Sequence, residues 1–222
     1  MGHMIFNRKI LGGAAAATIA LFSTQVVLAT ELKPCTAPSG VNLTARDNER
    51  LAGLIESRSK AIAAVGHEAE DAGEQSKDVV VGRNVGKLVS SLIEPGLLPL
   101  NDVVAGNYRC RWIQMGEPAV AYGYFSCQVT RNDQGSDQGW TLTKTSGSQR
   151  FSGVLKPGGD GLVYVGASFV AGEKAPKYGD NAETDQVGCL YRAADAPRHY
   201  VLELPQPGYG SQHDVVELVP AK

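Results

Sequence analysis

The hydrophobic residues of this chain follow a helical period before residue 95 and a strand period after residue 105. In the first part, apolar residues recur at steps of three, four and seven, at Leu51, Leu54, Ile55, Ile62 and Val65. This spacing predicts a helix over about residues 45–65 that begins with the capping-box-like sequence Thr44-Ala45-Arg46-Asp47. The apolar positions from Val79 to Ile93 predict a second helix, which ends before Glu94-Pro95-Gly96. The two helices are expected to form a hairpin whose apolar stripes cover a flank of the second part. A partner-binding groove is the alternative.

From Gly106 onward, apolar and polar residues alternate, as strands require. In the first run, Tyr108, Cys110 and Trp112 share one face, and Arg109 and Arg111 point the other way. The pattern predicts eight strands, at about residues 106–115, 123–131, 139–146, 149–156, 161–170, 186–193, 199–204 and 214–220. Eight antiparallel strands are just enough to close a barrel that is filled by side chains or holds one small ligand.

The predicted fold class is therefore α+β, with an N-terminal helical hairpin packed on an eight-stranded antiparallel β-barrel, calycin-like, or on a sandwich. Residues 30–100 would form the N-terminal segment and the hairpin, and residues 101–222 the barrel domain. Two connections are predicted to be long, Ala171–Asp185 and Pro205–His213. Long ordered loops often carry function on such scaffolds.

The first 29 residues are typical of a secretory signal peptide. Arg8 and Lys9 precede an uncharged stretch, which ends in the small-residue exit Val27-Leu28-Ala29. We expect cleavage after Ala29 and interpret residues 1–3 as a tag remnant. A membrane anchor is the alternative, but the stretch is only weakly apolar and no cationic stop follows it. The expected location is periplasmic or secreted, in a bacterial envelope, with no membrane span after cleavage.

All four cysteines lie after the predicted cleavage point, where an oxidising compartment allows an even set to pair. Three pairings are possible. A hairpin folded at Glu117-Pro118 would bring Cys110 beside Cys127, so this bridge is preferred, and Cys35–Cys189 is the second. Zinc sites need close cysteine pairs such as C-x-x-C, which are absent.

Composition narrows the function classes. The full sequence has 43% hydrophobic residues and 26 glycines, a composition that suits one compact domain with an appendage. The net charge of −2 offers no polycationic face, and basic and aromatic residues are not interleaved as single-stranded nucleic acid requires. We expect no nucleic-acid partner.

No catalytic constellation stands out. Ser211, His213 and Asp214 are crowded into one segment, whereas a triad needs groups that converge from separate backbone segments. The acidic segment 180–185 lacks the length and glycine of an EF-hand loop. Glu203 and Glu217 would pair only if they faced one cavity. We predict no catalytic residue, no metal and no cofactor.

The predicted contact surface combines one predicted turn with the late Pro-Gly connection. Ser146, Ser148 and Gln149 offer hydrogen-bonding groups, Gly147 permits a tight turn, and Arg150 adds a planar cation. Tyr209 and Gln212 would join them at the barrel mouth. The alternative is a hairpin turn whose hydroxyl groups bond to nearby backbone and whose arginine pairs locally.

Several segments carry a family resemblance: Tyr108-Arg109-Cys110-Arg111, Thr143-Lys144-Thr145-Ser146-Gly147-Ser148-Gln149-Arg150, Tyr178-Gly179-Asp180 and the tail Asp214-Val215-Val216-Glu217-Leu218-Val219-Pro220. They resemble the bacterial domain of unknown function 4893 family from about Leu43 to the end. The resemblance implies a secreted bacterial protein and transfers no catalytic residue. A fainter similarity is to calycin-type binders and periplasmic lysozyme inhibitors, some of which present a Ser-Gly loop, as Ser146-Gly147-Ser148 would here.

Three function classes follow. The sequence favours a non-enzymatic envelope protein that binds a small ligand or a protein partner with its barrel. A structural or assembly factor acting through the helical hairpin is the alternative, and a hydrolase comes third. A ligand-sized cavity of about 300 Å³ or more would favour the first class, and an exposed apolar patch on the helices the second. The oligomeric state does not follow from the sequence.

Overall fold

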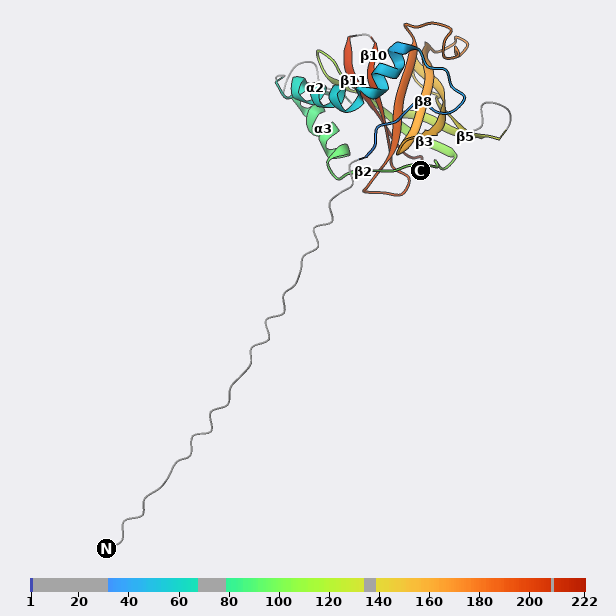
Figure 1. Ribbon diagram of the computed structural model, residues 1–222. Helices are drawn as coiled ribbons and strands as arrows, with labels where there is room; N and C mark the ends of the chain where they lie inside the picture. The colour runs from blue at the N-terminus through green and yellow to red at the C-terminus, as the bar shows by residue number, and fades with distance from the viewer. Residues whose placement is uncertain (2–31, 68–78, 134–138, 209) are drawn as a thin grey trace. The chain divides into compact units, whose positions relative to one another are not determined.

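The structure, a computed structural model, describes residues 1, 32–67, 79–133, 139–208 and 210–222 (Figure 1). The predicted signal peptide and its cleavage point therefore lie outside the described residues. Among the residues described, no helix is both long and apolar enough to cross a membrane.

Eight antiparallel strands form a closed barrel, as predicted. They are β3 (Gly106–Met115), β5 (Phe125–Asn132), β6 (Gly139–Lys144), β7 (Gln149–Gly158), β8 (Gly161–Val170), β9 (Asp185–Ala193), β10 (Tyr200–Gly208) and β11 (Ser211–Pro220). Neighbours in sequence are neighbours in the sheet, from β5 to β11. The barrel closes because β3 pairs with β11 on one edge and with β5 on the other. This closure excludes the sandwich.

Alternation along the strands sorts side chains to the inside and outside of the barrel. Inward residues fill one half of the barrel, at the end where β7 turns into β8. The buried cluster there includes Tyr108, Cys110, Cys127, Trp140, Leu142, Leu155, Leu162, Leu190, Tyr200, Leu202 and Leu218. These positions repeat every second residue, which is the strand period of the sequence.

Three short strands, which the sequence pattern did not predict, lie beside the barrel. β4 (Val120–Ala121) folds back onto the end of β3, and β1 (Val80–Val81) pairs with β4. β2 (Leu97–Leu98) pairs with the end of β9. Such two-residue strands are too short to leave an alternation in the sequence.

The helix predicted over residues 45–65 is two helices, α1 (Ala45–Ala52) and α2 (Leu54–Gly66), interrupted at Gly53. Glycine has little helical preference, and Gly53 donates its N–H to the carbonyls of Glu49 and Leu51 as the end of α1. The predicted cap is present, because the Thr44 hydroxyl accepts from the Asp47 N–H at 3.1 Å.

The second helix, α3 (Arg83–Ile93), begins later than the sequence pattern predicted and ends where expected. Val80 and Val81 are in β1, and Gly82 separates strand from helix with φ 62° and ψ −147°. That backbone conformation is open to glycine and strongly disfavoured for other residues. The helical hairpin is confirmed, since Gly86 of α3 lies against the Val65 side chain of α2.

The helices cover the outer face of the barrel at β9, β10, β11 and β3. Their apolar stripes are buried there in one cluster, whose helical and strand members include Ala61, Val65, Val85, Val89, Leu92, Ile113, Val201 and Val215. A second outer cluster packs α1 and the N-terminal segment against β8 and β9 through Cys35, Leu51, Leu54, Val163, Val187 and Tyr191. The apolar stripes of the helical hairpin are thus buried against the barrel.

The predicted long connection at residues 205–213 is wrong. β10 continues to Gly208 and β11 begins at Ser211, so the connection is residues 209–210. Pro205 and Pro207 argued against a strand because proline has no N–H to donate. The sheet accommodates them at a register shift between Pro205 and Gly208, beside Gln206 with φ 46°. The other long connection, 171–184, is present between β8 and β9.

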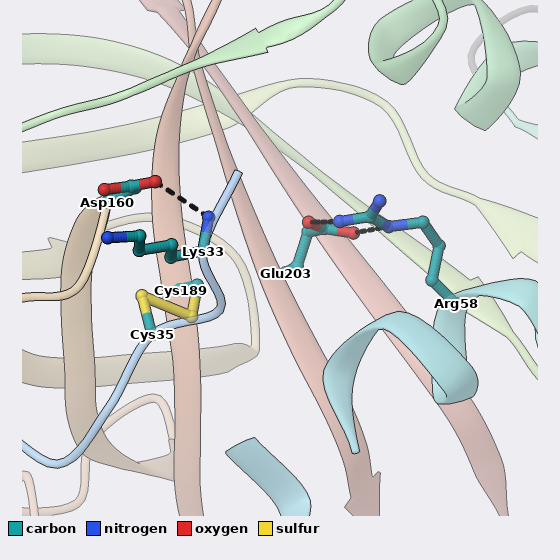
Figure 2. The surroundings of a disulfide bond; sticks show 6 residues. All are labelled: Lys33, Cys35, Arg58, Asp160, Cys189 and Glu203. Carbon is teal, nitrogen blue, oxygen red and sulfur yellow. Dashed lines mark hydrogen bonds and ion pairs between the residues drawn. A yellow bond between two sulfur atoms is a disulfide. The ribbon is translucent and has the colours of Figure 1, made fainter. Parts of the chain in front are cut away.

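Both predicted disulfides are present, Cys110–Cys127 inside the barrel and Cys35–Cys189 on its outer face. The second bridge ties the N-terminal segment to β9 (Figure 2). Beside it, the Lys33 N–H donates to the Asp160 carboxylate at 2.7 Å, which fastens the same segment to the β7–β8 turn.

A buried ionic network joins α2 to the barrel next to this disulfide. Glu203, directly opposite Cys189 in the β9–β10 pair, is fully buried and accepts two hydrogen bonds from Arg58 (Figure 2). His213 Nε2 lies 3.2 Å from the same carboxylate, and His213 Nδ1 lies 3.1 Å from Ser57 Oγ. Burial acts to raise the pKa of Glu203, but the contacts with His213 and Arg58 outweigh it and lower the pKa. Glu203 is therefore an ionised anchor for α2.

Candidate functional site

The other half of the barrel is hollow. An open pocket of about 800 Å³ lies at the end where β3, β6, β8 and β10 finish. It is lined by Trp112, Gln114, Tyr122, Phe125, Lys144, Ser148, Gln149, Phe151, Ser168, Phe169, Val170, Glu173, Lys174, Pro176, Asn181, Thr184, Gln186, Pro207 and Asp214. Most of these are inward-facing strand ends, and the remainder come chiefly from connection 171–184. We call this space the mouth pocket.

Two features of the strands shape the surroundings of the mouth pocket. At this end β4 pairs with β3 on one edge and with β1 on the other. Lower in the barrel, Gly153 and Gly166 face each other across β7 and β8. A Cβ atom on Gly166 would lie 2.5 Å from the Tyr164 hydroxyl, so the glycines leave room for that ring.

Aromatic rings form the floor of the mouth pocket. Trp112 packs edge-to-face on Phe151 at 5.2 Å between centroids, and Phe151 on Tyr164 at 6.1 Å. The Tyr164 hydroxyl is fully buried and has no hydrogen-bond partner among the residues described. Burial raises the pKa of Tyr164, so this hydroxyl stays neutral. The floor is apolar, with one spare polar group beneath it.

Asp214 is the buried acidic group of the mouth pocket and is only 2% exposed, whereas Glu173, which also lines it, is exposed. Its carboxyl group accepts from the Ser211 hydroxyl at 2.5 Å and from the Trp112 indole N–H at 2.7 Å. Burial raises the pKa of Asp214 to about 7, against hydrogen bonds from Ser211, Trp112 and the Met115 backbone that lower it. Asp214 therefore changes its charge near neutral pH.

Lys144 is the buried basic group of the wall, inward-facing at the end of β6 and 6% exposed, whereas Lys174, which also lines the pocket, is exposed. Its ammonium donates to the Gln149 carbonyl at 2.7 Å and lies 3.9 Å from the centroid of the Phe125 ring. Burial lowers the pKa of Lys144, and the positive charge of Arg150 lowers it further.

Neutral polar groups complete the wall. Gln186, at the start of β9, is 3% exposed, and its Oε1 has no partner among the described residues. Gln114 Oε1 accepts from the Tyr122 hydroxyl at 2.8 Å. A buried amide oxygen without a partner costs free energy unless a bound molecule or water satisfies it.

The structure divides the predicted contact residues. Ser148 and Gln149 line the mouth pocket. Ser146 accepts from the Ser126 N–H at 2.7 Å, and Arg150 Nε donates to the Gly147 carbonyl at 3.2 Å, so these two bond locally. Gln212 is exposed on β11 and lines a separate depression, and Tyr209 lies outside the described residues. A role for this rim in binding remains a prediction.

The residue pairs considered for catalysis do not converge. Ser211 contacts Asp214 at the mouth, but His213 faces outward into the network under α2. Glu203 lies in that same network, whereas Glu217 lies on the outer face with Arg111, Tyr124 and His199. Burial acts to raise the pKa of Glu217, but these partners lower it to about 2.

The acidic segment 180–185 binds backbone instead of gathering its oxygens at one point. Asp180 accepts from the Lys177 N–H, Asn181 from the Glu183 N–H, and Asp185 from the Gly179 N–H. Among the described residues, no group of three or more His, Cys, Asp or Glu side chains is arranged to hold a metal ion.

The fold and the mouth pocket define a class: a closed eight-stranded antiparallel barrel with one filled and one hollow end and helices on its outer face. A family model described as "Domain of unknown function (DUF4893)" matches residues 41–218. The chain belongs to this family, as its sequence resemblance predicted. Comparisons with curated proteins and with solved structures found no match in either set.

Proposed function

We propose that this protein is a non-enzymatic binding protein of the bacterial envelope that holds one small molecule in the mouth pocket. This proposal rests mainly on the size and the lining of the pocket. About 800 Å³ is within the range of small-molecule sites, and the combination of aromatic walls with a few fixed polar groups is typical of them.

Two further observations support this function over a role for the helical hairpin. The apolar stripes of α2 and α3 are buried against the barrel, which leaves little apolar surface on the helices for a partner. In contrast, Gln186, which lines the pocket, and Tyr164, which packs on Phe151 of the lining, keep buried polar atoms that have no hydrogen-bond partner among the described residues.

The envelope location rests on the paired cysteines and on the N-terminal sequence. Both bridges belong to the core clusters of the fold, and disulfides form and persist in oxidising compartments. The predicted signal peptide would deliver the chain there.

The proposed function is tested with N-phenyl-1-naphthylamine, an uncharged aromatic dye that fluoresces when it leaves water. We expect saturable binding of one dye per folded protein. Ser168→Trp places a large ring in the mouth pocket and should weaken dye binding at least about ten-fold. Thr130→Trp, the matched control, adds the same ring at an exposed position of β5 and should leave affinity unchanged.

Equal dye affinity for the wild type and Ser168→Trp would contradict binding in the mouth pocket. Far-UV circular dichroism of both variants establishes that the barrel is folded before affinities are compared.

A further inference from the structure

Lys144 is a buried basic residue for which the described part of the protein supplies no carboxylate partner. The side chain is 6% exposed, yet no carboxylate of the described residues lies within 4.0 Å of its ammonium nitrogen, since Lys144 takes part in none of the ion pairs of the structure. Its contacts are a carbonyl oxygen and the face of the Phe125 ring. Buried charges in proteins are normally paired, so this one lacks its counter-charge.

A purely structural role for Lys144 is poorly supported. It would consist of fixing the turn between β6 and β7 through the Gln149 carbonyl. That turn is already attached to β5, because the Thr145 N–H donates to the Ser126 carbonyl at 2.8 Å and Ser146 accepts from the Ser126 N–H. Arg150 closes the same turn onto the Gly147 carbonyl. The ammonium of Lys144 is therefore spare for another partner.

The position of the ammonium sets where that partner lies. Lys144 and Phe125 both line the mouth pocket, as does Gln186, on a strand three places away in the barrel, whose buried Oε1 has no partner among the described residues. An ammonium at one wall, an amide oxygen at another and aromatic rings between them match a specific kind of molecule. It has an apolar body, one anionic group and a hydrogen-bond donor.

We infer that the mouth pocket binds a small apolar molecule bearing a single anionic group, and that Lys144 is the counter-charge of that group. The inference rests on the proposed function and adds to it the chemical class of the ligand. Asp214, the acidic residue of the inner wall, is neutral below pH 7, since burial raises its pKa to about 7, and the other carboxylate of the lining, Glu173, is exposed and accepts from the Val170 N–H at 3.2 Å.

The test compares two dyes that differ only by an anionic group. 8-Anilino-1-naphthalenesulfonate has the ring system of N-phenyl-1-naphthylamine and adds one sulfonate. At pH 5.5, the wild type should bind the sulfonate dye at least about ten-fold more tightly than the neutral dye. Lys144→Met should remove this preference, with the affinity for the neutral dye unchanged. Lys177→Met, which removes one charge from an exposed site outside the pocket lining, should keep the preference.

The possible results distinguish the charge assignment of Lys144 from the proposed function. Neutral-dye binding without a preference for the sulfonate dye in the wild type overturns the charge assignment but leaves the proposed function standing. Equal preference in the wild type and Lys144→Met also overturns it. Absence of binding by either dye overturns both proposals. If Lys144→Met does not fold, Lys144→Arg is measured instead. It retains the charge, and loss of the preference in that folded variant would overturn the inference.

Discussion

Asp214→Asn should remove a pH dependence of stability that Asp214 imposes on the wild type. The carboxyl group has an ordinary pKa of 3.8 and a folded-state pKa of about 7, because it is buried. Between these two values the folded protein holds a proton that the unfolded chain has lost. The free energy of unfolding therefore falls as pH rises through this window.

The size of the effect follows from the shift in pKa. Each unit is worth about 1.4 kcal/mol, so the contribution lost between pH 4 and pH 7 is about 4 kcal/mol. Asparagine has a similar shape and no proton to lose. The amide can shift the free energy of unfolding by an amount that does not depend on pH. On top of that shift, the free energy of unfolding of Asp214→Asn minus that of the wild type should rise by up to about 4 kcal/mol between pH 4 and pH 7.

Urea unfolding followed by far-UV circular dichroism from pH 4.5 to pH 8 measures the difference. The other shifted groups are common to both proteins. Asp47, Glu203 and Glu217 have lowered pKa values and lose their stabilisation in acid, below this window. His199 has a raised pKa, because of its hydrogen bond to Glu217, and destabilises both proteins alike as pH rises through that value. Parallel stability curves for the two proteins would refute the buried, protonated state of Asp214.

Two further predictions concern the ionic network and export. Arg58→Met leaves the fully buried Glu203 carboxylate without its main partner and should cost about 3 kcal/mol of unfolding free energy, measured by urea unfolding. Lys60→Met, which breaks an exposed pair on the same helix, should cost far less, and equal losses would contradict the network's role. The mature chain isolated from a bacterial envelope should begin at Thr30, and an intact mass that includes residues 4–29 would rule out cleavage after Ala29.

The strands were predictable because alternation is a local signal. The pattern placed β3 and β8 at their observed bounds and the other six barrel strands within a few residues, apart from the extension of β10. The same local reasoning failed at positions where contacts with the rest of the fold determine the secondary structure. Pro205 and Pro207 fit a strand only because a bulge removes the need for their missing N–H groups, and Gly53 interrupts a helical pattern that otherwise continues.

The mouth pocket was harder to predict than the barrel. The composition of the turn at residues 146–150 predicts contact with a partner. Only Ser148 and Gln149 of that turn line the mouth pocket. A sharper signal lay within the strands. Lys144, Gln186 and Asp214 are polar residues at inward positions, where the alternation calls for apolar ones. The sequence does not show that the three lie at the same end, since this depends on strand direction and register around the whole barrel.

The division of the barrel into a filled end and a hollow end separates the residues that hold the fold from those that shape the pocket. The largest apolar cluster lies toward the filled end, and Ser168, Gln186 and Lys144 lie at the other, where Lys144 is directly opposite Cys127 of the inner disulfide. Exchanging side chains around the mouth, other than the buried Asp214, should therefore change which ligand the protein binds while the melting temperature changes little. Protein engineers could therefore change the ligand specificity of this disulfide-bonded barrel through residues of the mouth pocket and leave its filled end unchanged.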